Sequence, residues 1–201
     1  MWADGSYNKY SISLSTSIED ASEIDTIIQQ TGEWHKYNVK GRYRNGKKFK
    51  DSIEYRINSA DLSQWFNNFD YQQKSTVAPT KILNILPNNL RHFFYLGVSD
   101  GDGCFYYHKK RSIHQFNIAS TFDQDWSYMI QLCNDLGISK YNINHQRKIN
   151  KKSGKLNSSS CFRITNKPDI QKIGGYLYQQ YMITPLGLKR KLNKYMEMMQ
   201  R

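Results

Sequence analysis

The sequence is poor in cysteine, in acidic side chains and in long apolar segments, and each shortage excludes a class of protein. Its three cysteines, Cys104, Cys133 and Cys161, are an odd number without CxxC spacing, which argues against a disulfide scaffold and a cysteine-ligated zinc site. No apolar run approaches the roughly 18 residues of a membrane helix, and no signal-peptide pattern opens the chain. We therefore expect an intracellular protein with reduced thiols and no membrane partner.

Basic side chains strongly outnumber acidic ones: 29 Lys and Arg against 17 Asp and Glu give a formal net charge of +12. Aromatic residues make up 14% of the chain, which is too many for a disordered basic tail. A folded protein of this charge is expected to bind a polyanion such as nucleic acid. Abundant Asn, Ile, Lys and Tyr with little Ala are typical of an AT-rich genome, so we expect a phage protein in a bacterial cytoplasm or an organellar one (mitochondrion or chloroplast).

The chain contains an internal repeat with an offset near 105 residues. Five pairs of segments correspond, and they follow one another in the same order in both copies. The pairs are residues 2–7 with 101–105, 15–20 with 120–125, Gly32 with Gly137, 54–57 with 161–164, and 71–73 with 178–180. This order indicates a tandem duplication, with one copy at roughly residues 1–86 and the other at 87–201.

Each copy is predicted to contain the same elements in the order helix-strand-strand-helix-strand-strand-helix. Apolar and polar residues alternate at 12–14 and at 116–118, as in half-buried strands. Residues 17–20 and 121–124 have the spacing of a capping box, so a helix is predicted to follow directly in both copies. The predicted fold class is α+β, with two pseudo-symmetric repeats that each form an antiparallel sheet backed by helices.

Positive charge is concentrated in equivalent hairpins of the two copies, with turns predicted at Asn45-Gly46 and Ser153-Gly154. One basic hairpin is usually only a solvated surface, but equivalent ones in both copies favour contact with nucleic acid. Lys40, Arg42 and Arg44 alternate, so they are expected to project from one face of one strand. The predicted nucleic-acid-binding residues are Lys40, Arg42, Arg44, Lys47, Lys48, Lys50, Lys109, Lys110, Arg111, Arg147, Lys148, Lys151, Lys152 and Lys155.

The segment Asn89–Phe105 is predicted to be an apolar helix that starts from an Asn cap after Pro87 and ends in Asp100-Gly101-Asp102-Gly103. Gly97 and Gly101 are four residues apart and share one face, where a second helix can approach closely. The helix dipole disfavours acids at a C-terminal end. The two acids therefore require a compensating cation, and a metal is the obvious candidate.

The run Tyr95-Leu96-Gly97-Val98-Ser99-Asp100-Gly101-Asp102-Gly103 resembles the signature helix of the LAGLIDADG homing endonucleases. Residues 74–87 resemble the join between the halves of the single-chain members. The match departs from the motif letters at Tyr95, Leu96 and Ser99 but keeps the glycine and the Asp-Gly-Asp-Gly ending. The resemblance implies a monomer of two αββαββα repeats whose motif helices pack side by side and whose two saddle-shaped sheets straddle duplex DNA.

The resemblance also implies a reaction and its residues. The last acid of each motif, here Asp102 and by correspondence Asp4, would bind Mg²⁺ over the scissile phosphates. Lys74 and Lys189 are candidates for a basic side chain at the edge of that site, and a phosphate-contacting or plain surface role fits their positions equally well. Asp100 is expected to cap a helix end rather than bind metal. The implied function is site-specific hydrolysis of double-stranded DNA, of the kind that mobilises introns or inteins.

The first copy departs from the family pattern, because it begins Met1-Trp2-Ala3-Asp4 and the residues expected to form its motif helix are missing. Three explanations stay open: a second chain supplies the helix, the protein binds nucleic acid without cutting it, or the sequence begins inside a longer natural product. The alternative function is therefore a non-cleaving nucleic-acid-binding protein on the same scaffold. An intron maturase that binds structured intron RNA, a repressor and a structural RNA-binding factor are examples.

Overall fold

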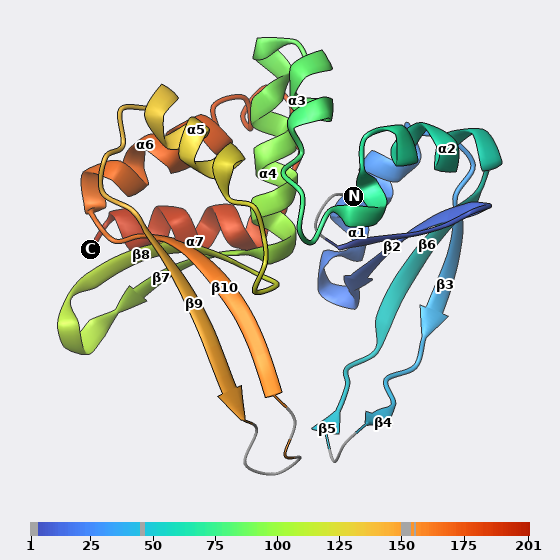
Figure 1. Ribbon diagram of the computed structural model, residues 1–201, viewed down its shortest axis with the longest axis horizontal. Coiled ribbons are helices and arrows are strands. Elements are labelled where there is room, and N and C mark those ends of the chain that lie inside the picture. The colour runs from blue at the N-terminus through green and yellow to red at the C-terminus, as the bar shows by residue number, and fades with distance from the viewer. Residues whose placement is uncertain (1–3, 45–46, 150–153, 155) are drawn as a thin grey trace. The chain divides into compact units, whose positions relative to one another are not determined.

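The computed structural model describes residues 4–44, 47–149, 154 and 156–201. The chain divides into two compact units, Met1–Gln72 and Gln73–Arg201, and each contains one four-stranded antiparallel sheet with helices on one of its faces (Figure 1). Residues 73–86, which the sequence repeat assigns to the first copy, pack with the second unit, where the N–H of Asp125 donates to the carbonyl oxygen of Thr76 at 3.1 Å. In the described parts of the chain, no helix is long and apolar enough to span a membrane.

The first unit has the strand order β1-β2-β6-β3. Its elements are β1 (Gly5–Asn8), β2 (Ser11–Ser17), α1 (Ala21–Ile28), β3 (His35–Val39), β4 (Tyr43–Arg44), β5 (Lys47–Lys48), β6 (Ser52–Asn58) and α2 (Ala60–Asn68). Strands β4 and β5 pair only with each other, with Arg44 opposite Lys47, so they form a small hairpin beyond the main sheet. The turn predicted at Asn45-Gly46 lies outside the described residues.

The core of the first unit lies between its sheet and α1. Alternating apolar residues turn one side of β2 and β6 inward, and Ile12, Ile53 and Tyr55 are buried there. The Tyr55 hydroxyl donates to the carbonyl oxygen of Ala21 at 3.0 Å and to Asp25 Oδ1 at 2.8 Å. These two bonds hold α1 in register on β6. Among the described residues of this unit, the opposite face of the sheet carries no helix (Figure 1).

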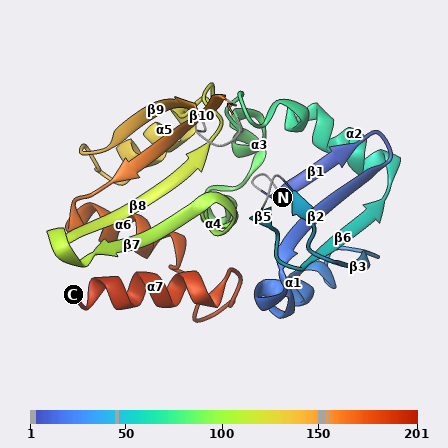
Figure 2. The same cartoon turned by 90° about the horizontal axis from the view of Figure 1, so that it is seen from below.

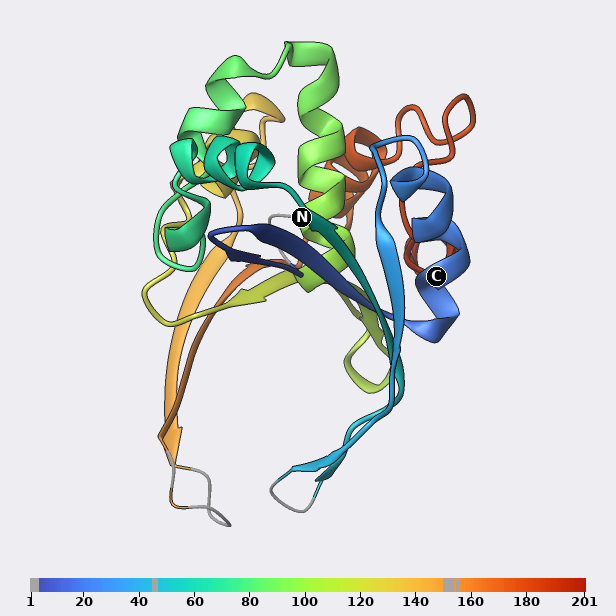
Figure 3. The ribbon, with the colours of Figure 1, turned by 90° about the vertical axis from the view of Figure 1, so that its right-hand side faces the viewer.

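The second unit repeats this topology with the strand order β7-β8-β10-β9 (Figure 2). Its elements are α3 (Thr80–Ile85), α4 (Arg91–Asp102), β7 (Gly103–His108), β8 (Ile113–Ser120), α5 (Ser127–Asp135), β9 (Asn142–Ile149), β10 (Leu156–Ile164), α6 (Lys167–Leu177) and α7 (Lys189–Met199). Strands β9 and β10 extend well beyond the helices that cover the rest of the sheet (Figure 3). The predicted fold class is confirmed: the chain is α+β and contains the same sheet twice.

Strand pairing confirms the repeat residue by residue. Tyr55 of β6 lies opposite Leu14 of β2, and Phe162 of β10 lies opposite Ile118 of β8 in the same position of the second sheet. Phe162 is completely buried and Tyr55 is 1% exposed, so both fill the centre of their cores. The correspondence of residues 54–57 with 161–164, read from the sequence, is therefore a correspondence in space.

The helix predicted directly after residues 121–124 begins later than expected. The Thr121 hydroxyl does not cap it, because it donates to the carbonyl oxygen of Ser75 on the connecting segment. Helix α5 begins only at Ser127, whose N–H is accepted by Asp125 Oδ1 at 2.8 Å. In the first unit, by contrast, Ser17 does cap a helical turn: its hydroxyl accepts the N–H of Asp20 at 3.2 Å.

Candidate functional site

Helix α4 carries the Asp-Gly-Asp-Gly sequence at its C-terminal end and leads directly into β7. A short turn of 3₁₀ helix (Asn88–Leu90) leads into it, and its cap position is Leu90, so the predicted Asn cap is not formed. Tyr95 anchors the helix to α5, since its buried hydroxyl donates to the carbonyl oxygen of Tyr128 at 3.2 Å. Gly97 is exposed, and a Cβ atom added there would meet no heavy atom within 4 Å among the described residues.

Asp100 has a structural role at the end of α4. Its Oδ2 atom accepts the N–H of Leu188 at 2.8 Å, and Leu188 is the residue that precedes the first turn of α7. Gly187, with φ of +108°, lets the chain pass close by, because a Cβ there would lie 3.0 Å from the same carboxylate oxygen. Asp100 thus caps a helix, as expected, but the helix is α7 rather than its own.

Lys191 supplies a cation at the C-terminal end of α4. Its side chain is buried, with 7% of the residue exposed, and Nζ donates to the carbonyl oxygens of Ser99 at 2.8 Å and of Gly103 at 2.7 Å. An ammonium group in this position offsets the negative end of the helix dipole. Sequence reasoning missed this residue. The available signal was a lysine on the apolar stripe of α7, between Leu188 and Tyr195 at helical spacing.

Asp102 and Asp4 occupy equivalent positions in the two units. Gly103 pairs with Ile118 as Gly5 pairs with Leu14, so each acid stands one residue before the first strand of its sheet. Both acids are exposed. Burial raises the pKa of Tyr128 and of Tyr71, and the negative charges of Asp102 and Asp4, respectively, add to that shift.

Asp4 and Asp102 fit a magnesium ion that takes only one or two of its ligands from the protein. Among the described residues, no group of three or more His, Cys, Asp and Glu side chains is arranged to hold a metal. Mg²⁺ is commonly bound by one or two carboxylates, with waters and substrate phosphate oxygens completing its shell. Exposed single acids such as Asp4 and Asp102 match that mode. Of the two predicted basic partners, Lys74 is half-buried, whereas Lys189 is exposed as the first residue of α7.

The helix-free face of the second sheet is polar and rich in amides. Cross-strand pairing places Cys104, Asn117, Arg163 and Asn142 in one row across the sheet. Within this face the Gln115 side chain donates to the Asn117 amide oxygen. Residues of the same face further along are Tyr106, Ala119, Asn144, Gln146, Lys148, Asn157, Ser159 and Cys161.

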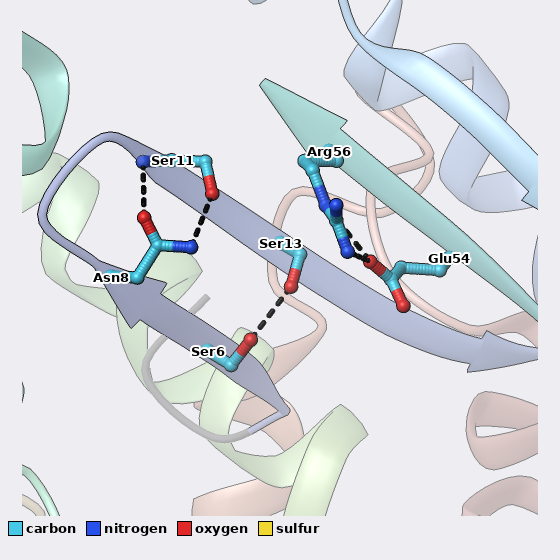
Figure 4. Close-up of polar contacts among 6 residues, drawn as sticks. All are labelled: Ser6, Asn8, Ser11, Ser13, Glu54 and Arg56. Carbon is cyan, nitrogen blue, oxygen red and sulfur yellow. Dashed lines mark hydrogen bonds and ion pairs between the residues drawn. The ribbon is translucent and has the colours of Figure 1, made fainter. Parts of the chain in front are cut away.

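The helix-free face of the first sheet has an equivalent row of Ser6, Ser13, Arg56 and His35. The hydroxyls of Ser6 and Ser13 are hydrogen-bonded at 2.6 Å, and Asn8 Nδ2 donates to Ser11 Oγ at 2.7 Å (Figure 4). Arg56 is paired with Glu54 on the same strand, with Nη2 2.6 Å from Oε1. Both sheets therefore present an arginine at the same position of a largely polar face.

The predicted alternation of Lys40, Arg42 and Arg44 along one strand is wrong. Strand β3 ends at Val39 and β4 begins at Tyr43. At the break, the N–H of Gly41 donates to Asp51 Oδ1 at 2.8 Å instead of continuing the sheet, and the N–H of Phe49 donates to the carbonyl oxygen of Arg42 at 3.0 Å. A Cβ at Gly41 would lie 1.9 Å from the carbonyl oxygen of Phe49, so the bend depends on glycine.

The remaining predicted basic residues occupy several places. Residues Lys109–Arg111 form the exposed turn between β7 and β8. Lys148 is on the helix-free face of β9, whereas the Arg147 guanidinium lies on the other face, 4.1 Å from the ring centroid of Phe122. Lys40, Arg42 and Lys50 are exposed, Arg44 is in β4, and Lys47 and Lys48 are in β5. The predictions at Lys151, Lys152 and Lys155 and the turn at Ser153 lie outside the described residues.

Comparison with protein-family models and with curated proteins gives no match. Among solved structures, the homing endonuclease I-WcaI bound to its DNA recognition sequence has 17% identity and a TM-score of 0.53, over 96% of this chain and 81% of that one. The I-SmaMI LAGLIDADG homing endonuclease bound to cleaved DNA has 16% identity and a TM-score of 0.50, over 94% and 77% of the two chains. The LAGLIDADG meganuclease I-CpaMI bound to uncleaved DNA has 15% identity and a TM-score of 0.50, over 94% and 79%.

Proposed function

We propose that this chain, which has the two-repeat fold of the LAGLIDADG homing endonucleases, is a site-specific nuclease that hydrolyses both strands of duplex DNA with Mg²⁺. The observation that carries the proposal is the pair of equivalent exposed acids, Asp4 and Asp102. Each stands at the start of a sheet with one polar face free of helices. Each unit thus has one acid and one polar sheet face. Two such units suit duplex DNA, in which each acid can serve one of the two antiparallel strands.

The two sheet faces carry the side chains that base recognition requires. Asparagine and glutamine pair with adenine edges in the major groove and arginine pairs with guanine, and a two-stranded ribbon fits that groove. The row that crosses all four strands offers Asn117, Arg163 and Asn142 in the second unit, and Arg56 and His35 in the first. The net charge of +12 supplies sequence-independent attraction to phosphates.

The chemistry is assigned to the end of α4 and to its counterpart in the first unit. Mg²⁺ bound there would polarise the scissile phosphate and lower the pKa of a bound water. Asp102 and Asp4 provide the carboxylate oxygens. Lys191 fixes the last turn on which Asp102 stands, because it binds the carbonyl oxygens of Ser99 and Gly103 on either side of it. The predicted edge lysines, Lys74 and Lys189, remain proposals for contacts to the phosphate.

The proposed biological setting follows from the same activity. A nuclease with a long recognition surface cuts few sites in a genome, which suits the mobility of an intron or intein. Both repeats lie in one chain, so we propose a monomer as the active form. Because the residue usage is typical of an AT-rich genome, we propose that the gene belongs to a phage or an organelle and that the protein acts inside the cell.

The test is a cleavage selection. The protein is incubated with a pool of long random duplexes and Mg²⁺, and the cut ends are sequenced. We expect a single consensus site for the wild type, loss of cutting with retained binding for Asp102→Asn, and normal cutting for Asp123→Asn, an exposed acid in a turn. Undiminished cleavage by Asp102→Asn would show that the metal assignment is wrong. Binding without cleavage, with a preference for structured intron RNA, would support the non-cleaving alternative.

A further inference from the structure

The two units present an arginine at the same position of their helix-free faces. Arg56 of β6 lies opposite Ser13 and His35, and Arg163 of β10 lies opposite Asn117 and Asn142. Each therefore stands on the third strand of a row that crosses all four strands of its sheet. Because the backbone positions are equivalent, any difference in what the two guanidinium groups recognise must come from their neighbours.

The neighbours differ in charge. Two residues before Arg56 on the same strand is Glu54, and two residues before Arg163 is Cys161. Glu54 Oε1 accepts from Arg56 Nε at 3.1 Å and from Nη2 at 2.6 Å (Figure 4). The Arg163 Nε atom is buried and has no hydrogen-bond partner within the described part of the chain. Of these two arginines, Arg56 alone is held on a carboxylate among the described residues.

The carboxylate fixes the orientation of the Arg56 guanidinium. Glu54 takes the edge formed by Nε and Nη2, and the group also lies 5.7 Å from the ring centroid of Tyr37 on β3. Arginine keeps its two terminal nitrogens, Nη1 and Nη2, on a second edge that can donate in parallel. That second edge matches the O6 and N7 acceptors of guanine in the major groove.

An arginine on a DNA-binding face can contact a phosphate instead of a base. The Glu54 carboxylate disfavours that phosphate contact for Arg56. The Arg56–Glu54 pair has no net charge, and Glu54 repels a phosphate that approaches it. The Arg56 side chain is 46% exposed, so the ion pair itself contributes little to the free energy of unfolding. Its effect is on recognition, since an arginine with a fixed edge loses less side-chain entropy on binding a base.

We propose that Arg56 reads a guanine in the half of the target bound by the first unit, and that Glu54 is the positioning residue that makes this contact selective. Arg163, without a carboxylate beside it, discriminates its base less strongly. The inference rests on the proposed binding of duplex DNA, and it makes the target asymmetric: one half carries a strict guanine that the equivalent position of the other half does not require.

The experiment is a binding selection from random duplexes without divalent metal, so that cleavage does not contribute. The wild type is expected to enrich one guanine sharply in one half-site. Arg56→Met should remove that preference, and Glu54→Gln should reduce it by about tenfold, while preferences at other positions stay unchanged. Cys161→Glu places a carboxylate beside Arg163, so it should create a new guanine preference at the equivalent position of the other half-site.

The outcomes separate this inference from the proposed function. A wild type that enriches no sequence at all would overturn the proposed function itself. A wild type that enriches a site whose sequence is the same for Arg56→Met and Glu54→Gln would overturn the inference and leave the function standing. If Glu54→Gln fails to fold, as judged by circular dichroism, Cys161→Glu decides: a new guanine preference supports the positioning role, and an unchanged site contradicts it.

Discussion

Lys191 is a cation buried inside the second unit, and its partners explain why it is tolerated there. Replacing it with methionine keeps the length of the side chain but removes the ammonium donor from the carbonyl oxygens of Ser99 and Gly103, and Ser99 keeps the backbone N–H of Gly103 as a donor. A hydrogen bond to a charged group is worth about 1.5–3 kcal/mol, and removal of the desolvated ammonium offsets part of the loss. We expect Lys191→Met to lower the free energy of unfolding by about 2 kcal/mol in urea denaturation.

Lys189 provides the matched control, since it lies two residues earlier on α7 and is exposed. Lys189→Met should change the free energy of unfolding by less than about 0.5 kcal/mol. Equal effects of the two substitutions would mean that the contacts of Lys191 with the end of α4 contribute nothing to stability. Cleavage by Lys191→Met should also fall, because Asp102 stands on the turn that loses its support.

His92 gives the second unit a pH-dependent stability. It is 1% exposed on α4 beside Phe93 and Tyr176, and burial lowers its pKa from the ordinary value of 6.5. The unfolded chain then binds the proton more tightly than the folded one, so the contribution is complete above pH 6.5 and is lost as the pH falls below it. We expect the unfolding midpoint in urea to decrease between pH 7.5 and 5.5.

His92→Gln should flatten that decrease because the titrating group is removed. Part of the slope should remain, since burial and the charge of Lys167 also lower the pKa of His114. The same substitution at His35, which is exposed on β3, serves as the control. A wild-type midpoint that does not change with pH would show that neither histidine is linked to unfolding.

At the scale of elements, the packing of α7 against α6 depends on a glycine of α6. A Cβ added to Gly174 would lie 2.2 Å from Tyr195 Cε2, whose ring packs on the helix backbone and whose hydroxyl donates to the carbonyl oxygen of Gln171 at 3.3 Å. Gly174→Ala should therefore displace α7 and destabilise the unit by about 1–3 kcal/mol. The measurement is thermal unfolding followed by circular dichroism.

The neighbouring Gly175 is the control for this prediction, because a Cβ there would meet nothing within 4 Å among the described residues. Gly175→Ala should stabilise the protein by up to about 1 kcal/mol through helix propensity alone. Tyr195→Leu in the Gly174→Ala background should cost less than the sum of the single changes, since the clash disappears. Additive effects would place the role of Gly174 elsewhere.

The elements that sequence patterns predicted well are those whose signals are local. Helix α4 and strands β2 and β8 follow from apolar spacing within short segments, and the correspondence of Tyr55 with Phe162 follows from the repeat. The start of α5 was missed because Thr121 has a partner on a distant segment, the carbonyl oxygen of Ser75. A side chain such as Thr121 can hydrogen-bond either to its own helix or to another segment, and sequence spacing alone does not show which partner it has.

Sequence reasoning located the acids of the candidate site but not their surroundings. Asp4 and Asp102 follow from the repeat, and the strand register confirms their equivalence. Lys191 was missed because its partners, Ser99 of α4 and Gly103 of β7, lie 92 and 88 residues earlier in the chain. The break at Gly41 was missed for the same kind of reason: alternating charges predict one straight strand, and only the contacts with Phe49 and Asp51 show that the strand ends.

At the scale of the whole molecule, the excess of positive charge predicts how binding depends on salt. The exposed turn Lys109–Arg111 joins the first two strands of the second sheet, and we expect it to contact phosphates. Each phosphate contact makes the plot of log association constant against log salt concentration steeper by about 0.9. Replacing all three residues with alanine should therefore make this plot shallower for duplex DNA, by up to about 2.7. Binding is measured by fluorescence anisotropy at several salt concentrations.

The control must remove the same charge from another place, because any loss of three positive charges weakens long-range attraction. Lys81, Lys140 and Lys194 are exposed and lie on α3, a loop and α7, outside the strands of the sheets. Alanine at these three positions should lower affinity slightly and leave the slope nearly unchanged, since the slope reports counterions displaced at the contact itself. If both triple variants change the slope equally, net charge rather than a defined contact explains the binding, and if neither does, the phosphates are contacted elsewhere.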